Sequence, residues 1–435
     1  MIEGSEHEPG HEPGPGAAPV VEVGWRATVR RQLAFGRASL PDDHGARWLD
    51  EHGEPDPAQG VHTWITARMA HVYSLGVLLT GGDEAAGYRE LARRAVAALA
   101  GPLHDDEHGG WFAGLDADGT PAQEGTKSAY PHAFVLLAAA SGAVAEVPGA
   151  AELLALATDV LDERLVDATG LPVDRWDRTF TDLAPYRGVN AAMHLLEASL
   201  AAWDVAHDAR HLDRAVAVAT PVVAWAAERD WRVPEHFTAQ ARGEAWVEQP
   251  EHHRDQPDHP FEPYGATVGH GLEWSRLVLQ LDAALAAAGR PAVLDAVIAA
   301  RGLYDRAVTD GWARDGADGF VYTTDWSGMP VVRTRMHWVV AEAVCAASTL
   351  AVTTGDPRYA EDLAAWRAHA AAVWEDPATC TWVHERSPAL DASATVWRGR
   401  PDLYHSVHAA LLPELPPAPT AARALAERAA LTPGG

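Results

Sequence analysis

The sequence predicts an all-α fold, an (α/α)6 barrel in which six helical hairpins form a toroid. About a dozen apolar segments of helical length recur along the 435 residues. Segments that carry polar or ionisable residues alternate with plain alanine- and leucine-rich ones, which is the pattern of an inner and an outer ring of helices. No glycine-rich phosphate loop follows a strand, and strands do not alternate with helices, so a parallel α/β sheet is not expected.

The predicted helices follow one another closely. They cover residues 26–37, 64–80, 84–100, 129–144, 149–165, 190–207, 210–228, 268–288, 291–308, 337–354, 358–374 and 403–412. The connections at 106–119 and 311–328 contain Gly, Trp and Asp, and we expect them to form short hairpins over one mouth of the barrel.

One catalytic domain is expected over residues 21–415. Residues 1–20 are of low complexity and contain Glu-Pro-Gly twice, which predicts a disordered N-terminal arm. Residues 416–435 are expected to be a C-terminal tail. No composition shift or linker divides the region between them.

Charge and composition limit the possible partners. A formal charge of −27 argues against binding to DNA or RNA, whose phosphates require basic patches. The N-terminus has no basic start and no apolar core, and no uninterrupted apolar run of 18 residues occurs, so we expect a cytoplasmic protein without a membrane span. Cys345 and Cys380 show neither a metal-binding spacing nor a disulfide framework, and we interpret both as structural thiols.

The segment 263–274, PYGATVGHGLEW, is the most informative part of the chain. It places His270, Glu273 and Trp274 at i, i+3 and i+4 on one helical face, after helix-breaking glycines. A histidine in the first turn of a helix is held neutral by the helix dipole, so His270 is a candidate proton carrier.

Three more apolar segments carry polar residues at helical spacing. These residues are Trp64, Arg68 and His71; Asn190, His194 and Glu197; and Arg335, His337, Trp338 and Glu342. Helices this apolar are buried on most sides, so their polar stripes are expected to meet in one shared cavity. A polyhydroxylated ligand would supply the hydrogen bonds that such buried groups need.

The chain contains a single lysine, Lys127, beside 33 arginines. A chain so enriched in arginine could retain one lysine because a compact ammonium is needed there, or it could retain it by chance. A Schiff-base role is the third reading, although nothing marks a cofactor site around Lys127.

Several blocks together resemble the N-acylglucosamine 2-epimerase superfamily. They are WLDEHG (48–53), WITARM (64–69), KSAYPHAF (127–134), YRGVNAAMH (186–194), PYGATVGHGLEW (263–274), HWVVAEA (337–343) and PDLYH (401–405). The branch most similar to this chain contains aldose–ketose isomerases that act on mannose, with sulfoquinovose isomerases close by. The resemblance implies an (α/α)6 barrel, no cofactor, no metal and a monosaccharide substrate at the centre.

The resemblance also implies roles for individual residues. His405 would be the base that handles the C2 proton, and His270 would be the second acid/base, although the division of work between them stays open. Glu273 would orient His270 or bind a hydroxyl group. The residues implied to bind sugar oxygens are Arg68, Tyr130, Asn190 and His194. Trp326 and Trp338 are candidates for stacking on the sugar ring.

Two departures from the resembling families bear on the substrate. Glu262 stands where relatives often have arginine, which argues against an anionic sulfonated sugar, and Ala192 replaces an asparagine. His337-Trp338 stands where cellobiose 2-epimerases and related epimerases have Trp-Trp, which favours isomerisation. We therefore predict interconversion of D-mannose and D-fructose, with D-lyxose and D-xylulose as a further pair; a mannose or cellobiose 2-epimerase and a sulfoquinovose isomerase remain alternatives.

Other classes of function remain open on the sequence. His194-x-x-Glu197 and His270-x-x-Glu273 could hold a metal ion, although di-iron bundles use the reverse order of these residues. Asp325 and Glu342 could be the carboxylate pair of a glycoside hydrolase on the same toroid. A non-catalytic binding protein is the third class. The segment 242–260 could form a lid or a dimer contact, its histidines are expected at the surface, and the protein is expected to be a monomer or a homodimer.

Overall fold

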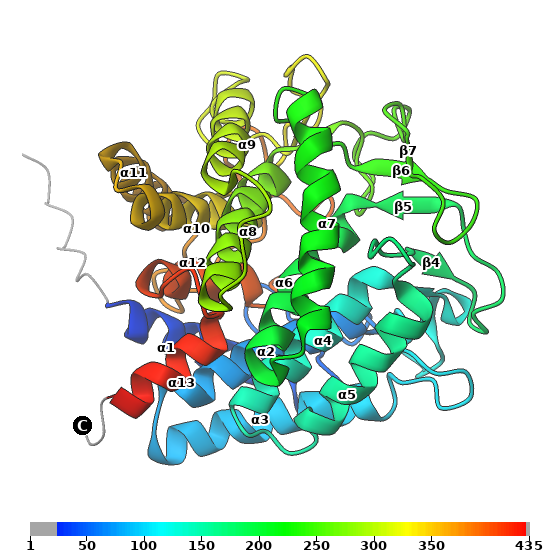
Figure 1. Cartoon of the computed structure of the whole chain (residues 1–435). Helices are drawn as coiled ribbons and strands as arrows, with labels where there is room; N and C mark the ends of the chain where they lie inside the picture. The colour runs from blue at the N-terminus through cyan, green and yellow to red at the C-terminus, as the bar shows by residue number, and fades with distance from the viewer. Residues whose placement is uncertain (1–23, 432–435) are drawn as a thin grey trace, which may run out of the picture.

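Two concentric rings of helices form the body of the protein in residues 24–431, the part that this computed structural model describes (Figure 1). The inner ring consists of α2 (Thr63–Leu79), α4 (Ala129–Val144), α6 (Val189–Ala206), α8 (Val268–Ala287), α10 (His337–Thr354) and α12 (Tyr404–Leu411). The outer ring consists of α3 (Gly82–Ala100), α5 (Ala150–Val160), α7 (Ala209–Glu228), α9 (Ala296–Gly311), α11 (Pro357–Val373) and α1 (Trp25–Phe35). Each outer helix packs on an inner one, and α12 packs on α1, α10 and α2, so the ring closes and the predicted (α/α)6 barrel is confirmed.

The two rings differ in sequence as the packing requires. Inner helix α4 is buried along nearly its whole length, whereas outer helix α7 buries one stripe that includes Leu212, Ala215, Val222 and Ala226. Helix α10 is long and apolar enough to cross a membrane by composition, but 72% of it is buried inside the barrel, as is expected of a core helix.

Short strands lie at the N-terminal ends of the inner helices. The strands are β1 (Val61–His62), β2 (Gly114–Leu115), β3 (Lys127–Ser128), β4 (Arg175–Trp176), β5 (Tyr186–Gly188), β6 (His236–Thr238), β7 (Val247–Glu248), β8 (Ala266–Thr267), β9 (Thr323–Thr324), β10 (Arg335–Met336) and β11 (Glu385–Arg386). They pair antiparallel as β1–β2, β3–β4, β5–β6–β7, β8–β9 and β10–β11. Five inner helices start directly after a strand, so this pairing sets the position of their first turns.

Gly269 lies inside the first turn of α8, whereas the sequence had suggested a helix-breaking role for the glycines here. A Cβ atom at Gly269 would lie 2.2 Å from the ring of Trp338. The absence of a side chain therefore lets the indole of Trp338 lie directly against the start of α8, beside His270.

The two ends of the chain were expected to lie outside the barrel, as an arm and a tail. The expected disordered arm, residues 1–20, lies outside the described residues. The expected tail, 416–435, contains helix α13 (Ala421–Leu431), which packs on α2, α4 and α6 and buries Ala422 and Leu425.

Lys127 fastens two loops to the barrel. Its side chain is fully buried in β3, and Nζ donates to Asp105 Oδ2 (2.9 Å) and to the main-chain oxygens of Gly109 (2.5 Å) and Arg178 (2.7 Å). The three donors of the ammonium are thus used by three acceptors, which a planar guanidinium could not reproduce. This geometry gives the single lysine a structural role.

Replacing Lys127 should weaken the fold. Lys127→Met should lower the free energy of unfolding by about 3 kcal/mol, because it breaks a buried ion pair and leaves the main-chain oxygens of Gly109 and Arg178 without this donor, although Asp105 keeps its contact with Arg178. Lys127→Arg should also be destabilising, since a guanidinium does not fit the three acceptors. Urea denaturation measures both effects. The control Arg423→Ala, which removes an exposed ion pair with Glu427, should change the free energy of unfolding by less than about 1 kcal/mol. If Lys127→Met and Arg423→Ala had equal effects, the structural role of Lys127 would be wrong.

Candidate active site

A cavity opens at the N-terminal ends of the inner helices, with a volume of about 700 Å3 that includes its open mouth. It is lined by Trp64, Arg68, Tyr130, Asn190, His194, Pro260, Phe261, Pro263, His270, Glu273, Tyr322, His337, Trp338, His384, Trp397, Pro401, Asp402 and His405. Every inner helix contributes a residue of its first turn, so these helices converge on one space, as the sequence predicts. Four residues of the predicted polar stripes do not line it: His71, Glu197, Arg335 and Glu342.

Most of the predicted site residues line this cavity, but Trp326 does not. Arg68, His194 and Glu273 lie one helical turn deeper than the first-turn residues of the inner helices. Trp338 is one of those first-turn residues, in α10. The indole of Trp326 points elsewhere, because its N–H donates to the main-chain oxygen of Pro250 (2.9 Å). Trp326 is therefore not placed to stack on a ligand in the cavity.

His405, in the first turn of α12, is oriented by a buried carboxylate on α10. Its Nδ1 lies 3.0 Å from Glu342 Oε1, and the Glu342 side chain is fully buried. Because the carboxylate accepts, the proton is on Nδ1 and the Nε2 lone pair is left free. Burial lowers the pKa of His405 well below its usual value, and the charge of Arg68 adds to this effect, so His405 is neutral.

His270 forms a second histidine–carboxylate pair, and its partner is Glu235 rather than Glu273. His270 Nδ1 lies 2.9 Å from both oxygens of Glu235, a residue in the loop before β6 that is 3% exposed. The main-chain oxygen of Glu235 also accepts from the N–H of Val189 (3.0 Å), the first residue of α6. Glu235 therefore links the starts of α6 and α8 while it orients His270.

Below the cavity, Arg276 of α8 holds three carboxylates from three inner helices. Its nitrogens lie 3.1 Å from Glu342, 3.3 Å from Glu273 and 3.6 Å from Glu197. Glu197 also accepts a hydrogen bond from the hydroxyl of Tyr404. All of these side chains are nearly or completely buried, so their charges are not screened by water.

The three carboxylates do not carry equal charge. Burial raises the pKa of Glu273 well above its usual value, and the charges of Glu342 and Glu197 add to the shift. The pKa of Glu197 is well below its usual value, because His194 and Arg276 together outweigh the opposing effect of burial. Glu273 thus keeps its proton more readily than the other two carboxyl groups, and in its protonated form it can donate a hydrogen bond into the cavity that it lines.

Arg68 places a permanent cation at the wall of the cavity. Its guanidinium contacts Asp402 Oδ2 (3.3 Å) and donates to the hydroxyl of Tyr130 (3.1 Å). It also lies over the rings of Trp64 (4.8 Å) and Phe134 (4.5 Å), which fix its plane. Arg68 and Tyr130 together present donors to an oxygen atom of a ligand.

Three more rings complete the wall between the two catalytic candidates. Trp338 lies between the histidines, with ring centroids 5.3 Å from His270 and 5.8 Å from His405. His337 stacks on His384 at 3.8 Å, and burial lowers the pKa of His337 well below its usual value. These neutral, flat groups suit the faces of a sugar ring.

The contacts of the alternative sites considered on the sequence do not favour those functions. His194, Glu197 and Glu273 come close enough to hold an ion, but Arg276 already contacts both glutamates and supplies the cation there. Asp325 does not line the cavity and accepts main-chain hydrogen bonds within its own turn, while Glu342 is held by His405 and Arg276. Asp325 and Glu342, the carboxylate pair of the alternative hydrolase reading, therefore do not meet in the cavity.

Several residues of the site were missed on the sequence. Glu235 and His384 lie in irregular segments, where no periodicity marks them. Arg276 could have been found, because it lies three residues after Glu273 in an otherwise apolar helix. Asp402 stood only within the PDLYH block, without a role, and it pairs with Arg68.

Comparisons with known proteins show which sequences and folds this chain is similar to. The family model of N-acylglucosamine 2-epimerase (GlcNAc 2-epimerase) matches residues 45–409. The chain is 46% identical over 403 residues to a D-mannose isomerase of Thermobifida fusca, covering 92% of this chain and 96% of that one. It is 39% identical to a D-mannose isomerase of Pseudomonas cannabina pv. alisalensis, with 91% and 93% covered. A crystal structure of a D-mannose isomerase has the same fold, with a TM-score of 0.81 at 23% identity, covering 92% of this chain and 99% of that one.

Acid should destabilise the protein through its buried histidines. Burial lowers the pKa of His71 and His194 to about 4 and that of His132 and His384 to about 3, so the unfolded chain binds protons that the folded chain does not. This stability is fully present above the ordinary value of 6.5 and is lost as the pH falls through the folded values. The free energy of unfolding should fall by about 1.4 kcal/mol per pH unit for each such histidine.

Urea denaturation between pH 7 and pH 4 measures this slope. His132→Gln can still accept from the N–H of Trp111, and it should reduce the slope by one proton. His44→Gln, at a histidine whose side chain is 70% exposed, should leave the slope unchanged. A free energy of unfolding that is constant over this range would contradict the prediction.

Proposed function

This chain belongs to the N-acylglucosamine 2-epimerase family, and we propose that it is an aldose–ketose isomerase that interconverts D-mannose and D-fructose. The observation that carries the proposal is the pair of cavity-lining histidines, His405 and His270, each held through Nδ1 by a buried carboxylate. The two relatives named D-mannose isomerase, which match over nine-tenths of the chain, support the choice of substrate.

The reaction moves one hydrogen within the sugar. After ring opening, a base removes the proton from C2, a cis-enediol forms, and the proton is delivered to C1 while O1 and O2 exchange theirs. C2 is oxidised and C1 reduced, so the sugar itself balances the electrons. We assign the base to Nε2 of His405, since this imidazole is neutral and its Nδ1–H is fixed by Glu342. His270 would then open the ring and move the proton between O1 and O2.

The enediolate carries negative charge on oxygen, and the cavity offers donors for it. Arg68 and Tyr130 form one group of donors, and protonated Glu273 is another. The N-termini of six inner helices also point toward the cavity, and the positive ends of their dipoles favour an anion there. Asn190, His194 and Trp338 would bind the remaining hydroxyl groups and the ring face.

The substrate class, the cellular location and the oligomeric state also belong to this proposal. A monosaccharide is the substrate class that the isomerase relatives imply. A cytoplasmic location and a monomeric or homodimeric state stay predictions.

The proposal is tested by incubating the purified, chelator-treated protein with D-mannose in deuterated water and recording proton NMR spectra. Fructose with deuterium at C1 is expected, because the proton that His405 takes from C2 can exchange with solvent on the imidazole before it is delivered to C1. Glucose as the main early product would reassign the protein as a 2-epimerase. No conversion of any free aldose, together with release of reducing sugar from glycosides, would overturn the proposal in favour of a hydrolase.

Removing either histidine should stop turnover without unfolding the protein. His405→Asn and His270→Asn should each lower kcat by at least about a hundredfold, since the amide can still donate to Glu342 or Glu235 but has no Nε2. Steady-state kinetics measures the loss, and thermal unfolding checks the fold. The exposed control His44→Asn should be normal in both measurements. A kinetically normal His405→Asn would contradict the assignment of the base.

Glu235 should act as a positioning residue for His270. In Glu235→Gln the amide can donate to Nδ1 and so favour the opposite tautomer, and kcat should fall by at least about tenfold with a changed pH profile. Glu248→Gln, which alters a surface ion pair with Arg229, is the matched control. A loss of stability with unchanged pH dependence would indicate a merely structural role for Glu235.

A further inference from the structure

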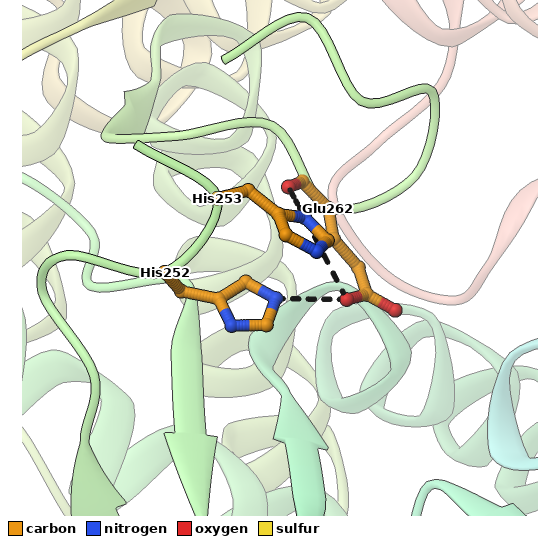
Figure 2. A group of neighbouring side chains, drawn as sticks. All are labelled: His252, His253 and Glu262. Atoms are coloured by element: carbon orange, nitrogen blue, oxygen red, sulfur yellow. Dashed lines mark hydrogen bonds and ion pairs between the residues drawn. The ribbon is translucent and has the colours of Figure 1, made fainter. Parts of the chain in front are cut away.

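A second group of titratable side chains lies beside the mouth of the cavity, in the loop 249–265 that connects β7 to β8. Figure 2 shows His252, His253 and Glu262 directed toward one another from the two ends of this loop. The same loop contributes Pro260, Phe261 and Pro263 to the cavity wall. The group is separate from the histidines of the proposed reaction.

The three side chains are spaced as metal ligands would be. His252 Nε2 lies 2.8 Å from Glu262 Oε2, and His253 Nδ1 lies 3.9 Å from the same oxygen. One ligand atom from each residue lies within 4.8 Å of the others. Tetrahedral zinc, with bonds of about 2.1 Å, requires ligand atoms about 3.4 Å apart, which lies between the two measured separations.

The donor set has a definite preference among cations. Two imidazole nitrogens and one carboxylate oxygen suit zinc and its first-row neighbours, whereas Ca2+ and Mg2+ prefer oxygen alone. Three protein ligands leave a fourth position for water. Both histidine side chains are only partly exposed, 24% for His252 and 26% for His253, although the sequence had suggested surface positions.

Neighbouring groups already hold these ligands in place. Arg175 contacts Glu262 Oε1 (2.6 Å) and leaves Oε2 for the cluster. The N–H of Glu262 donates to His259 Nδ1 (3.0 Å), and the ring of His259 lies tilted against that of His253, with the centroids 4.4 Å apart. Such supporting contacts are typical around metal ligands, because they orient the donor atoms.

Two features oppose binding of a cation. The guanidinium of Arg175 repels it, but that side chain is 49% exposed, so solvent screens its charge. His253 Nδ1 lies 2.8 Å from the main-chain oxygen of Glu262 and must give up this hydrogen bond. Neither feature removes a ligand from the set. Glu262 Oε2 and His252 Nε2 already lie close together, and His253 Nδ1 becomes a ligand atom once its hydrogen bond is broken and its proton moves to Nε2.

We propose that His252, His253 and Glu262 bind a divalent transition-metal ion of the zinc class, and that the ion ties the two ends of the loop 249–265 together. The bound ion would hold Phe261 at the mouth of the cavity. The inference does not depend on the proposed isomerase reaction, since it concerns only the cluster and its loop.

Titration of the tag-free, chelator-treated full chain with ZnCl2 in a calorimeter tests the proposal. One saturable equivalent should bind to the parent, and this binding should be lost in the double variant His252→Ala/His253→Ala and in Glu262→Gln. Co2+ in place of Zn2+ should give the intense visible absorption of tetrahedral coordination in the parent only. The variants should unfold at the parent's temperature in the presence of chelator, which shows that their folds are intact.

A matched control is His44→Ala/His52→Ala, which removes two histidines with 70% and 79% exposed side chains and should keep the zinc equivalent. Zinc should also slow amide hydrogen exchange in residues 249–265 of the parent and not of the double variant. Absence of saturable binding to the parent would overturn the proposal. So would zinc binding that survives in the double variant, including binding that is lost instead in Glu197→Gln.

Discussion

One buried guanidinium, that of Arg276, sets the chemistry of the cavity floor. It contacts Glu197, Glu273 and Glu342, three carboxylates that would repel one another strongly if they were ionised together in a dry interior. One cation does not balance three anions, so the proton remains on Glu273, which lines the cavity. Because Arg276 also holds Glu342, the same contact fixes the acceptor that orients His405. The charge of Arg276 therefore accounts both for Glu273 as a hydrogen-bond donor and for the orientation of His405 as the base.

The barrel places this chemistry at one end because all six inner helices begin there. A residue in the first turn of an inner helix points into the shared space, and a residue three or four positions later lies one layer deeper. Asn190 and His194 on α6 show this two-layer arrangement, as do His270 and Glu273 on α8. The positive ends of the helix dipoles add to the effect, so an anionic intermediate is favoured at this end of the barrel and not at the other.

The periodic part of the site could be predicted from the sequence, and the irregular part could not. The twelve helices were predictable because the inner ones are apolar on nearly all sides, and Arg68 and His405 stood out as polar residues at helical spacing. Glu235 lies in a loop, and its position depends on a contact with Val189 that no local pattern encodes. Trp326 shows the converse limit, since an aromatic residue near a predicted mouth does not reveal the direction of its side chain.

The arrangement of charge around the cavity favours a neutral sugar over an anionic one. A sulfonate or phosphate needs a cation with free donors, because desolvating the anion is costly otherwise. Among the residues that line the cavity, Arg68 is the permanent cation, and it already contacts Asp402. Near the mouth, Arg175 is paired with Glu262, the residue that stands where a cation had been expected in sulfosugar relatives. The remaining donors are hydroxyl, amide, imidazole and protonated carboxyl groups, which match the hydroxyl groups of an uncharged hexose.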